Sequence, residues 1–211
     1  MSAAELDELA ASLAAGEIVA VPTDTVYGLA VDPRLPGAVE RLFALKGRPE
    51  LSALPVLIAK PAALGDLAEA PPPAVRLAAR YWPGALTLVL SRLSGVGFEL
   101  GGDPNTIGLR CPDNDLLREL LEITGPLAVT SANHHGDPPC HTPGAVRRHL
   151  GTGVSHVLDG GRCDGLPSTV VSLVSGVLQC LREGEVSFAE LADFAAGLSS
   201  APPMPGAGAA S

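Results

Sequence analysis

Aromatic residues make up only 3% of this 211-residue chain. Proteins that bind single-stranded nucleic acid stack the bases on aromatic side chains, so the composition argues against such a surface. Cationic residues are also few, because 14 Lys and Arg stand against 23 Asp and Glu and leave a net charge of −9. This balance disfavours broad, nonspecific binding to phosphate backbones, although a local basic groove stays open.

The chain also lacks paired cysteines and long apolar runs. Its cysteines form no CxxC pair, which predicts reduced, mostly buried thiols: Cys111, Cys140, Cys163 and Cys180. No apolar stretch approaches the ~18 residues of a membrane span. The first residues carry Glu and Asp where a signal peptide would have a basic start. We therefore expect a soluble, cytoplasmic protein without membrane contact.

Several common catalytic motifs are absent. There is no G-x-x-x-x-G-K-[ST] and no G-x-S-x-G, and the glycines from Gly95 to Gly101 have the wrong spacing for a dinucleotide fingerprint. The loop from His134 to His141 contains histidines and a cysteine, which are zinc ligands, but their spacing matches no common zinc pattern. We expect solvated histidines there and predict no protein-held metal.

Hydrophobic residues make up 46% of the chain and predict a buried core. Apolar runs predict strands at residues 17–21, 29–31, 54–58, 85–90, 106–110, 127–130, 155–158, 168–174 and 177–182. Helical patterns lie between Ser2 and Gly16 and at residues 36–46, 61–69, 73–81, 113–123, 142–150 and 188–198, with Asp113 as a cap. We predict an α/β fold, a single-domain open twisted mixed sheet over residues 1–198. A Pro/Gly/Ala-rich tail at 199–211 is predicted to be disordered.

The stretch from Val19 to Leu29 begins as a strand and leaves it at Pro22, which cannot donate a ladder hydrogen bond. Three hydroxyls and a carboxylate follow within five positions: Thr23, Asp24, Thr25 and Tyr27. One interpretation is a capped turn beside a core tyrosine. The other is a polar shelf at the mouth of a sheet, where small ligands bind. We expect Asp24 to cap the turn and give it no chemical role.

Further polar residues lie at predicted strand or helix ends. Each also has a purely structural interpretation, because cations stabilise the C-terminal ends of helices and small polar residues cap turns. Together they suggest an anionic ligand, such as a nucleotide beside an amino acid. They are Lys46, Arg48, Thr106, Arg110, Ser131, Asn133, Ser168, Thr169 and Arg182.

The motifs PTDTVYGL, KGRP, WPGALTLVL, T-x-G-x-R, TSAN, LDGG and STVV with a following LREG stand in one order between Gly16 and Gly184. As a set they resemble the YrdC-like threonylcarbamoyl-adenylate synthases in their short, single-domain form. The resemblance implies an open sheet with a concave, positively lined cavity. It also implies an enzyme that converts L-threonine, bicarbonate and ATP to L-threonylcarbamoyl-adenylate, with Mg²⁺ bound mainly through ATP. Transferase proteins would then modify tRNA, and a weak contact to tRNA or double-stranded RNA is left open.

The resemblance also implies a role for each matching residue. Thr25, Arg110 and Ser168 would bind threonine. Lys46 and Arg48 would be the catalytic cations at the triphosphate. The remaining ATP contacts would be Thr106, Ser131, Asn133 and Arg182.

Two positions depart from the family pattern. Ala59 stands where many relatives have a histidine, and Pro139 where a serine often contacts ATP. A paralogue acting on a different small substrate therefore stays an alternative. The others are a double-stranded RNA-binding or ribosome-assembly factor and a carbamoyl-adenylate module like that of hydrogenase maturation carbamoyltransferases.

Overall fold

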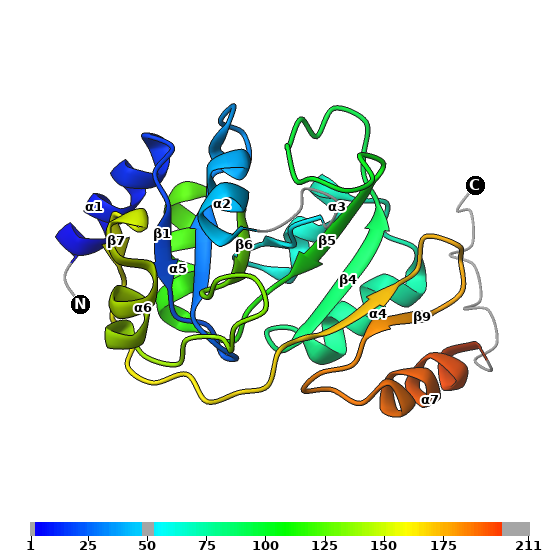
Figure 1. Ribbon diagram of the computed structural model, residues 1–211. Helices are drawn as coiled ribbons and strands as arrows, with labels where there is room; N and C mark the ends of the chain where they lie inside the picture. The colour runs from blue at the N-terminus through cyan, green and yellow to red at the C-terminus, as the bar shows by residue number, and fades with distance from the viewer. Residues whose placement is uncertain (1–2, 48–52, 200–211) are drawn as a thin grey trace.

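The computed structural model describes residues 3–47 and 53–199, and a nine-stranded open sheet runs through this part of the chain (Figure 1). The strand order is β7-β1-β2-β6-β3-β5-β4-β8-β9. The pairs β1–β7, β3–β5 and β4–β8 are parallel and the others antiparallel, so the sheet is mixed as predicted. The bounds are β1 Val19–Val21, β2 Gly28–Val31, β3 Val56–Leu57, β4 Leu86–Ser91, β5 Thr106–Arg110, β6 Leu127–Ser131, β7 His156–Val157, β8 Thr169–Ser172 and β9 Gln179–Arg182.

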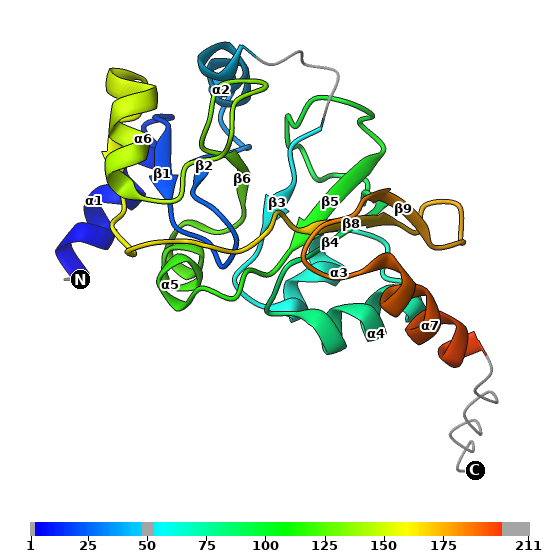
Figure 2. The same ribbon diagram turned by 60° about the horizontal axis from the view of Figure 1, so that its bottom comes forward.

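Helices cover both faces of one half of the sheet. Figure 2 shows α1 and α5 on one side of β1, β2 and β6, and α2 and α6 on the other. Helices α3, α4 and α7 gather at the other half, where Tyr81 of α4 meets Phe194 of α7 edge-on, with ring centroids 5.7 Å apart. The bounds are α1 Ala3–Ala14, α2 Ala38–Lys46, α3 Leu64–Leu67, α4 Pro72–Tyr81, α5 Asp115–Thr124, α6 Pro143–Leu150 and α7 Phe188–Ser199, with 3₁₀ turns at Pro61–Ala63 and Gly151–Gly153.

The first half is buried on both faces at its centre, because β1 and β2 carry no polar side chain and are buried at every position. In β1, Val19 and Val21 join a cluster with the leucines of α1 and α5. Ala20 between them points the other way and packs in the cluster that includes α2 and α6. A strand places successive side chains on opposite faces, so continuous apolar runs suit a two-sided burial.

In the part of the chain that the structure describes, helices cover the second half of the sheet on one face only (Figure 2). In β4, Leu86, Leu88 and Leu90 join the cluster that includes α3 and α4, while Thr87 and Val89 line a cavity on the opposite face. The same alternation in β5 sends Ile107 and Leu109 to the core, and the residues of the T-x-G-x-R motif to the cavity. The cavity therefore lies on the face of the sheet that the described helices leave uncovered.

Most predicted elements are confirmed, with ends that differ by a few residues. The prediction that Asp113 caps a helix is wrong, because α5 begins after Asn114, whose side chain accepts a hydrogen bond from the Leu117 amide at 3.0 Å. Helix α7 reaches Ser199, and residues 200–211 of the predicted tail lie outside the described residues. Over the described residues, none of the helices has the length and apolar character needed to cross a membrane.

Candidate functional site

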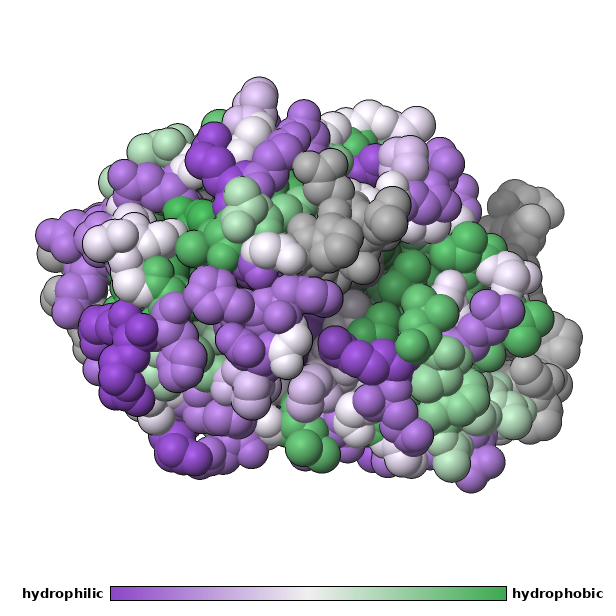
Figure 3. All heavy atoms as spheres, viewed as in Figure 1, coloured by the Kyte–Doolittle hydropathy of each residue, from purple (hydrophilic) through white to green (hydrophobic). Residues whose placement is uncertain are grey.

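The cavity over the uncovered half of the sheet has a volume of about 700 Å³. Its walls come from the β1–β2 turn, β3 with the residues before it, β4, β5, the end of β6 with the loop after it, the start of β8 with the segment before it, and β9. On the face shown in Figure 3, hydrophobic surface gathers on the side where Figure 1 places β4, β8 and β9. Seven of the predicted site residues line the cavity: Thr25, Thr106, Arg110, Ser131, Asn133, Ser168 and Arg182. Arg48 lies outside the described residues.

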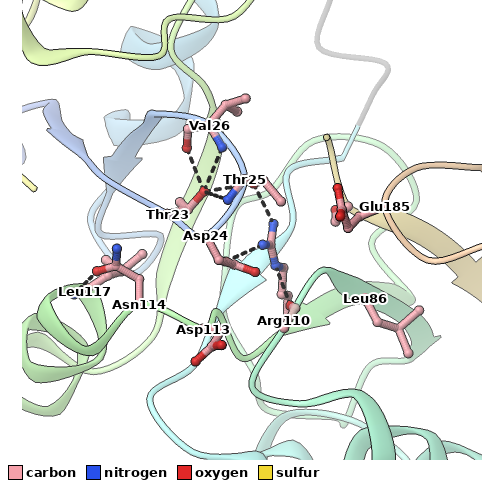
Figure 4. A network of polar contacts seen from close by, with 12 residues as sticks. Thr23, Asp24, Thr25, Val26, Leu86, Arg110, Asp113, Asn114, Leu117 and Glu185 are labelled. Carbon is pink, nitrogen blue, oxygen red and sulfur yellow. Dashed lines mark hydrogen bonds and ion pairs between the residues drawn. The ribbon is translucent and has the colours of Figure 1, made fainter. Parts of the chain in front are cut away.

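The turn between β1 and β2 is organised by Thr23. Its hydroxyl oxygen accepts hydrogen bonds from the backbone amides of Thr25 at 3.0 Å and Val26 at 3.1 Å, and the hydroxyl donates to the Val26 carbonyl at 2.6 Å. The expectation that Asp24 caps this turn is therefore wrong. Thr23 closes the turn, and the Asp24 side chain points instead toward Arg110 (Figure 4).

Arg110, at the end of β5, is held by three groups of the protein. Its Nε donates to the Gly84 carbonyl at 3.0 Å, Nη1 to the Thr25 hydroxyl at 3.3 Å, and Nη2 to Asp24 Oδ1 at 2.5 Å. Only 7% of the Arg110 side chain is exposed. The guanidinium is thus buried, charge-paired and fixed in orientation, which suits recognition of a carboxylate.

The segment from Asp159 to Ser168, which we call the strap, passes over the β1–β2 turn. The Tyr27 hydroxyl accepts from the Gly160 amide at 3.1 Å and donates to the Gly161 carbonyl at 2.9 Å. Gly165 lies so close to the turn that a Cβ there would be 2.5 Å from the Asp24 carbonyl oxygen. Burial raises the pKa of Tyr27 to about 12. These contacts fix one wall of the cavity.

Ser168 ends the strap and holds the opposite wall. Its hydroxyl lies 3.0 Å from the Thr87 hydroxyl, and its carbonyl accepts from Arg182 Nη2 at 2.8 Å and from Nε at 3.2 Å. Arg182, from β9, also approaches the Ser168 hydroxyl at 3.2 Å. The predicted threonine contact and the predicted ATP contact are therefore joined by direct hydrogen bonds.

Lys46 lies behind the wall and does not line the cavity. Only 3% of the residue is exposed, and its ammonium donates to the Ser131 carbonyl at 2.5 Å, the Asn133 carbonyl at 2.7 Å and Asn133 Oδ1 at 3.2 Å. Asn133 Nδ2 in turn donates to the carbonyls of His134 and Asp137, both at 2.8 Å. Lys46 thus holds the loop that carries Ser131 and Asn133 to the cavity. That Lys46 also contacts a triphosphate stays a prediction.

Two residues at the site were missed by the sequence reasoning. Thr87 lines the cavity and meets Ser168, and Asp24 pairs with Arg110. The alternation of Leu86, Thr87 and Leu88 contains the signal for the first, because a lone polar residue in an apolar strand marks its other face. The partner of Asp24 is 86 residues away, and nothing local to the turn indicates it.

The loop histidines do not form a metal cluster in the part of the chain that the structure describes, where no three His, Cys, Asp or Glu residues gather. His134 places its ring nitrogens 3.1 Å from the Leu45 carbonyl and 3.0 Å from the His149 carbonyl. All four cysteines are free, as predicted, and only Cys180 is exposed. Burial raises the pKa of the Cys111 thiol to about 11, so this thiol is protonated at neutral pH.

Tyr27→Phe tests how the strap is held. At about pH 9 we expect the variant to unfold with a free energy about 1–2 kcal/mol lower than the wild type, because two strap groups lose their partner. The raised pKa of Tyr27 means that its contribution is fully present below about pH 10 and is lost as the pH rises toward about 12. Urea unfolding followed by Trp82 fluorescence should show the difference shrinking at about pH 11.5. An equal difference at both pH values would contradict the prediction.

Lys46→Met tests the loop. The substitution keeps the length of the side chain but removes the charged donor of the Asn133 carbonyl. The other two acceptors keep a partner, because the Asn133 amide donates to the Ser131 carbonyl and the Ser131 hydroxyl to Asn133 Oδ1. We therefore expect the free energy of unfolding to fall by roughly 1–3 kcal/mol. The control is Lys60→Met, which removes an exposed ion pair with Glu122 and should cost less than about 0.5 kcal/mol. Urea midpoints of the two variants check the prediction, and a Lys46→Met midpoint equal to the control's would refute it.

Comparison with known proteins gives the same family as the sequence motifs. The model of the Sua5/YciO/YrdC domain, described as "Telomere recombination", matches residues 11–184. The threonylcarbamoyl-AMP synthase of Bacillus subtilis is 35% identical over 187 residues, 87% of this chain and 54% of that protein. The enzyme of the same name from Photobacterium profundum is 35% identical over 165 residues, 74% of this chain and 86% of its own.

Among solved structures, Pyrococcus abyssi Sua5 complexed with L-threonine superimposes with a TM-score of 0.86 at 34% identity. The match covers 92% of this chain and 58% of that one. The chain thus spans little more than half of its longer relatives and most of the shorter one. Sequence, fold and the order of the motifs agree, and the chain belongs to the Sua5/YciO/YrdC family.

Proposed function

We propose that this chain is a threonylcarbamoyl-AMP synthase that joins L-threonine, bicarbonate and ATP and releases pyrophosphate and water. The observation that carries the proposal is the single cavity in which the Arg110 guanidinium and the Thr25 hydroxyl lie on one side and the Ser131–Asn133 loop on another. The names of the relatives and the threonine-bound structure of one of them support it.

The amino-acid end of the cavity would bind threonine through complementary charge and hydrogen bonds. Arg110 would donate to the substrate carboxylate, and the hydroxyls of Thr25 and Ser168 offer both donors and acceptors. Because these side chains are already fixed by other protein groups, little conformational entropy is lost when the ligand binds. Bicarbonate and the threonine amine would then form a carbamate.

The other end would bind ATP. A carbamate oxygen attacks the α-phosphorus in line while pyrophosphate leaves, and this displacement requires positioning and charge neutralisation but no covalent nucleophile. Thr106, Ser131, Asn133 and Arg182 line the wall where these contacts are proposed. Lys46 and Arg48 are proposed to act on the triphosphate, Lys46 from behind the Ser131–Asn133 loop.

ATP would enter as its Mg²⁺ complex. Asp137 is the one acidic side chain among the described residues that line the cavity, and hydroxyl and amide groups make up much of the rest of its polar lining. Mg²⁺ commonly keeps its waters and binds through substrate phosphates with one or two carboxylates, so this donor set fits a metal carried by ATP. The ion would supply positive charge that neutralises the leaving pyrophosphate, and Asp137 is the carboxylate of this lining that could help to hold it.

The product would pass to transferase proteins that modify tRNA, and the reaction would take place in the cytoplasm. A weak contact of this chain with tRNA or double-stranded RNA belongs to the same proposal. This RNA contact would be confined to a small part of the surface, because a net charge of −9 disfavours broad binding to phosphates.

Release of pyrophosphate from ATP tests the function. We expect release by the purified chain that requires both L-threonine and bicarbonate, because the carbamate is the attacking group. Well-folded protein whose pyrophosphate release does not depend on threonine would refute the proposal. Tight, salt-sensitive binding of double-stranded RNA in its place would favour the RNA-binding alternative.

Arg110→Ala tests the amino-acid end. Loss of a charge-assisted contact to the carboxylate should raise the KM for L-threonine by roughly 30- to 100-fold, while the KM for ATP changes less than about threefold. Arg110→Lys, which keeps the charge paired with Asp24, guards against misfolding and should raise the threonine KM less. Arg92→Ala is the matched control, since Arg92 donates to the Phe98 carbonyl and does not line the cavity. Equal, small effects on both substrates would remove this role from Arg110.

A further inference from the structure

Asp24 places a carboxylate on the same guanidinium that is proposed to bind the substrate carboxylate. Its Oδ1 lies 2.5 Å from Arg110 Nη2, and the two side chains are 15% and 7% exposed. An ion pair so shielded from water interacts more strongly than one on the surface. The inference below rests on the proposed function and concerns how tightly this site holds its amino acid.

Asp24 reaches the ligand only through Arg110. Thr23 and Thr25 on either side of it line the cavity, whereas Asp24 does not. The strap closes over this residue, since a Cβ on Gly165 would lie 2.5 Å from the Asp24 carbonyl oxygen. Figure 4 shows the Asp24 side chain directed at Arg110 from the β1–β2 turn. Asp24 is thus placed to orient the arginine without contact with the substrate.

The guanidinium keeps donors for a ligand after these contacts. Of its five N–H hydrogens, one goes to Gly84, one to Thr25 and one to Asp24 among the described residues. One hydrogen on each terminal nitrogen remains for a carboxylate. Asp24 therefore fixes the direction of the fork, and its negative charge offsets part of the attraction that the fork exerts on an anion.

We propose that Asp24 is a positioning residue that orients Arg110 and lowers the affinity of the site for the amino-acid carboxylate. The product keeps that carboxylate, so the same offset speeds its release. Substitutions separate the orientation of Arg110 from the reduction in affinity. Asp24→Asn removes the charge but keeps an oxygen that can accept a hydrogen bond from Nη2. Asp24→Ala removes the charge and the anchor together.

Titration calorimetry with L-threonine and with L-threoninamide, which lacks the carboxylate charge, tests the proposal. For Asp24→Asn we expect the Kd of threonine to fall about three- to tenfold, since a nearby like charge is gone, and the Kd of the amide to stay within about twofold. The kcat for pyrophosphate release should fall as the product leaves more slowly. For Asp24→Ala we expect the Kd of threonine to rise, because Arg110 loses its orientation.

If Asp24 had only a structural role, the Kd of threonine would not fall in Asp24→Asn and rise in Asp24→Ala. Asp24→Glu keeps the charge and should not bind threonine more tightly than the wild type, which provides a second variant if one of the others fails to fold. The matched control is Asp32→Asn, which removes the carboxylate from the Asp32–Arg34 pair away from the cavity. It should lower stability and leave the Kd of threonine unchanged.

The outcomes separate this inference from the proposed function. Wild-type protein that binds no threonine would overturn both. Wild-type binding with the same threonine Kd in Asp24→Asn, or with a weaker Kd in both Asp24→Asn and Asp24→Ala, would overturn the role of Asp24 alone.

Discussion

The site depends on one constraint: the helices that the structure describes cover half of the sheet on only one face. A strand must point every second side chain to each face, so β4 and β5 carry leucines toward α3 and α4 and smaller or polar residues away from them. The uncovered face becomes the floor of a cavity of about 700 Å³. In the other half, where helices pack on both faces, the same alternation buries the side chains of both faces in the core.

Contacts between distant parts of the chain build the walls on this floor. Tyr27 fastens the strap 133 and 134 residues away, Arg110 meets Asp24 across 86 residues, and Lys46 meets Asn133 across 87. Each contact joins a side chain to an oxygen or amide of a loop. The loops therefore take their positions from buried polar groups that would be costly to leave unpaired.

This division explains how much could be predicted from the sequence. The Thr106–Arg110 motif can be assigned to a strand with one polar face, because alternation is a local property, and β5 has those bounds. Most predicted site residues also line one cavity, since strand ends of one sheet meet at its edges. The Lys46 contacts could not be predicted, because its partners are mainly backbone carbonyls. Every residue carries such a carbonyl, so the sequence does not indicate which ones Lys46 contacts.

Asp24 was assigned to the turn for the same reason, since its real partner is fixed by tertiary structure. Asp commonly caps turns, but here Thr23 already fills that role. Because Thr23 satisfies the turn, the Asp24 carboxylate is left to pair with Arg110.

The cations at the site are committed to protein oxygens before any ligand arrives. Arg110 donates to Asp24, Arg182 to the Ser168 carbonyl and Lys46 to the loop carbonyls. Under the proposed function, a chain with a net charge of −9 would meet a polyanionic nucleotide with these three cations already hydrogen-bonded to protein oxygens. Under the proposed function, neutralisation of the phosphates would depend on the Mg²⁺ that ATP carries. The protein cations would then act mainly by fixing geometry, in which orientation matters more than net charge.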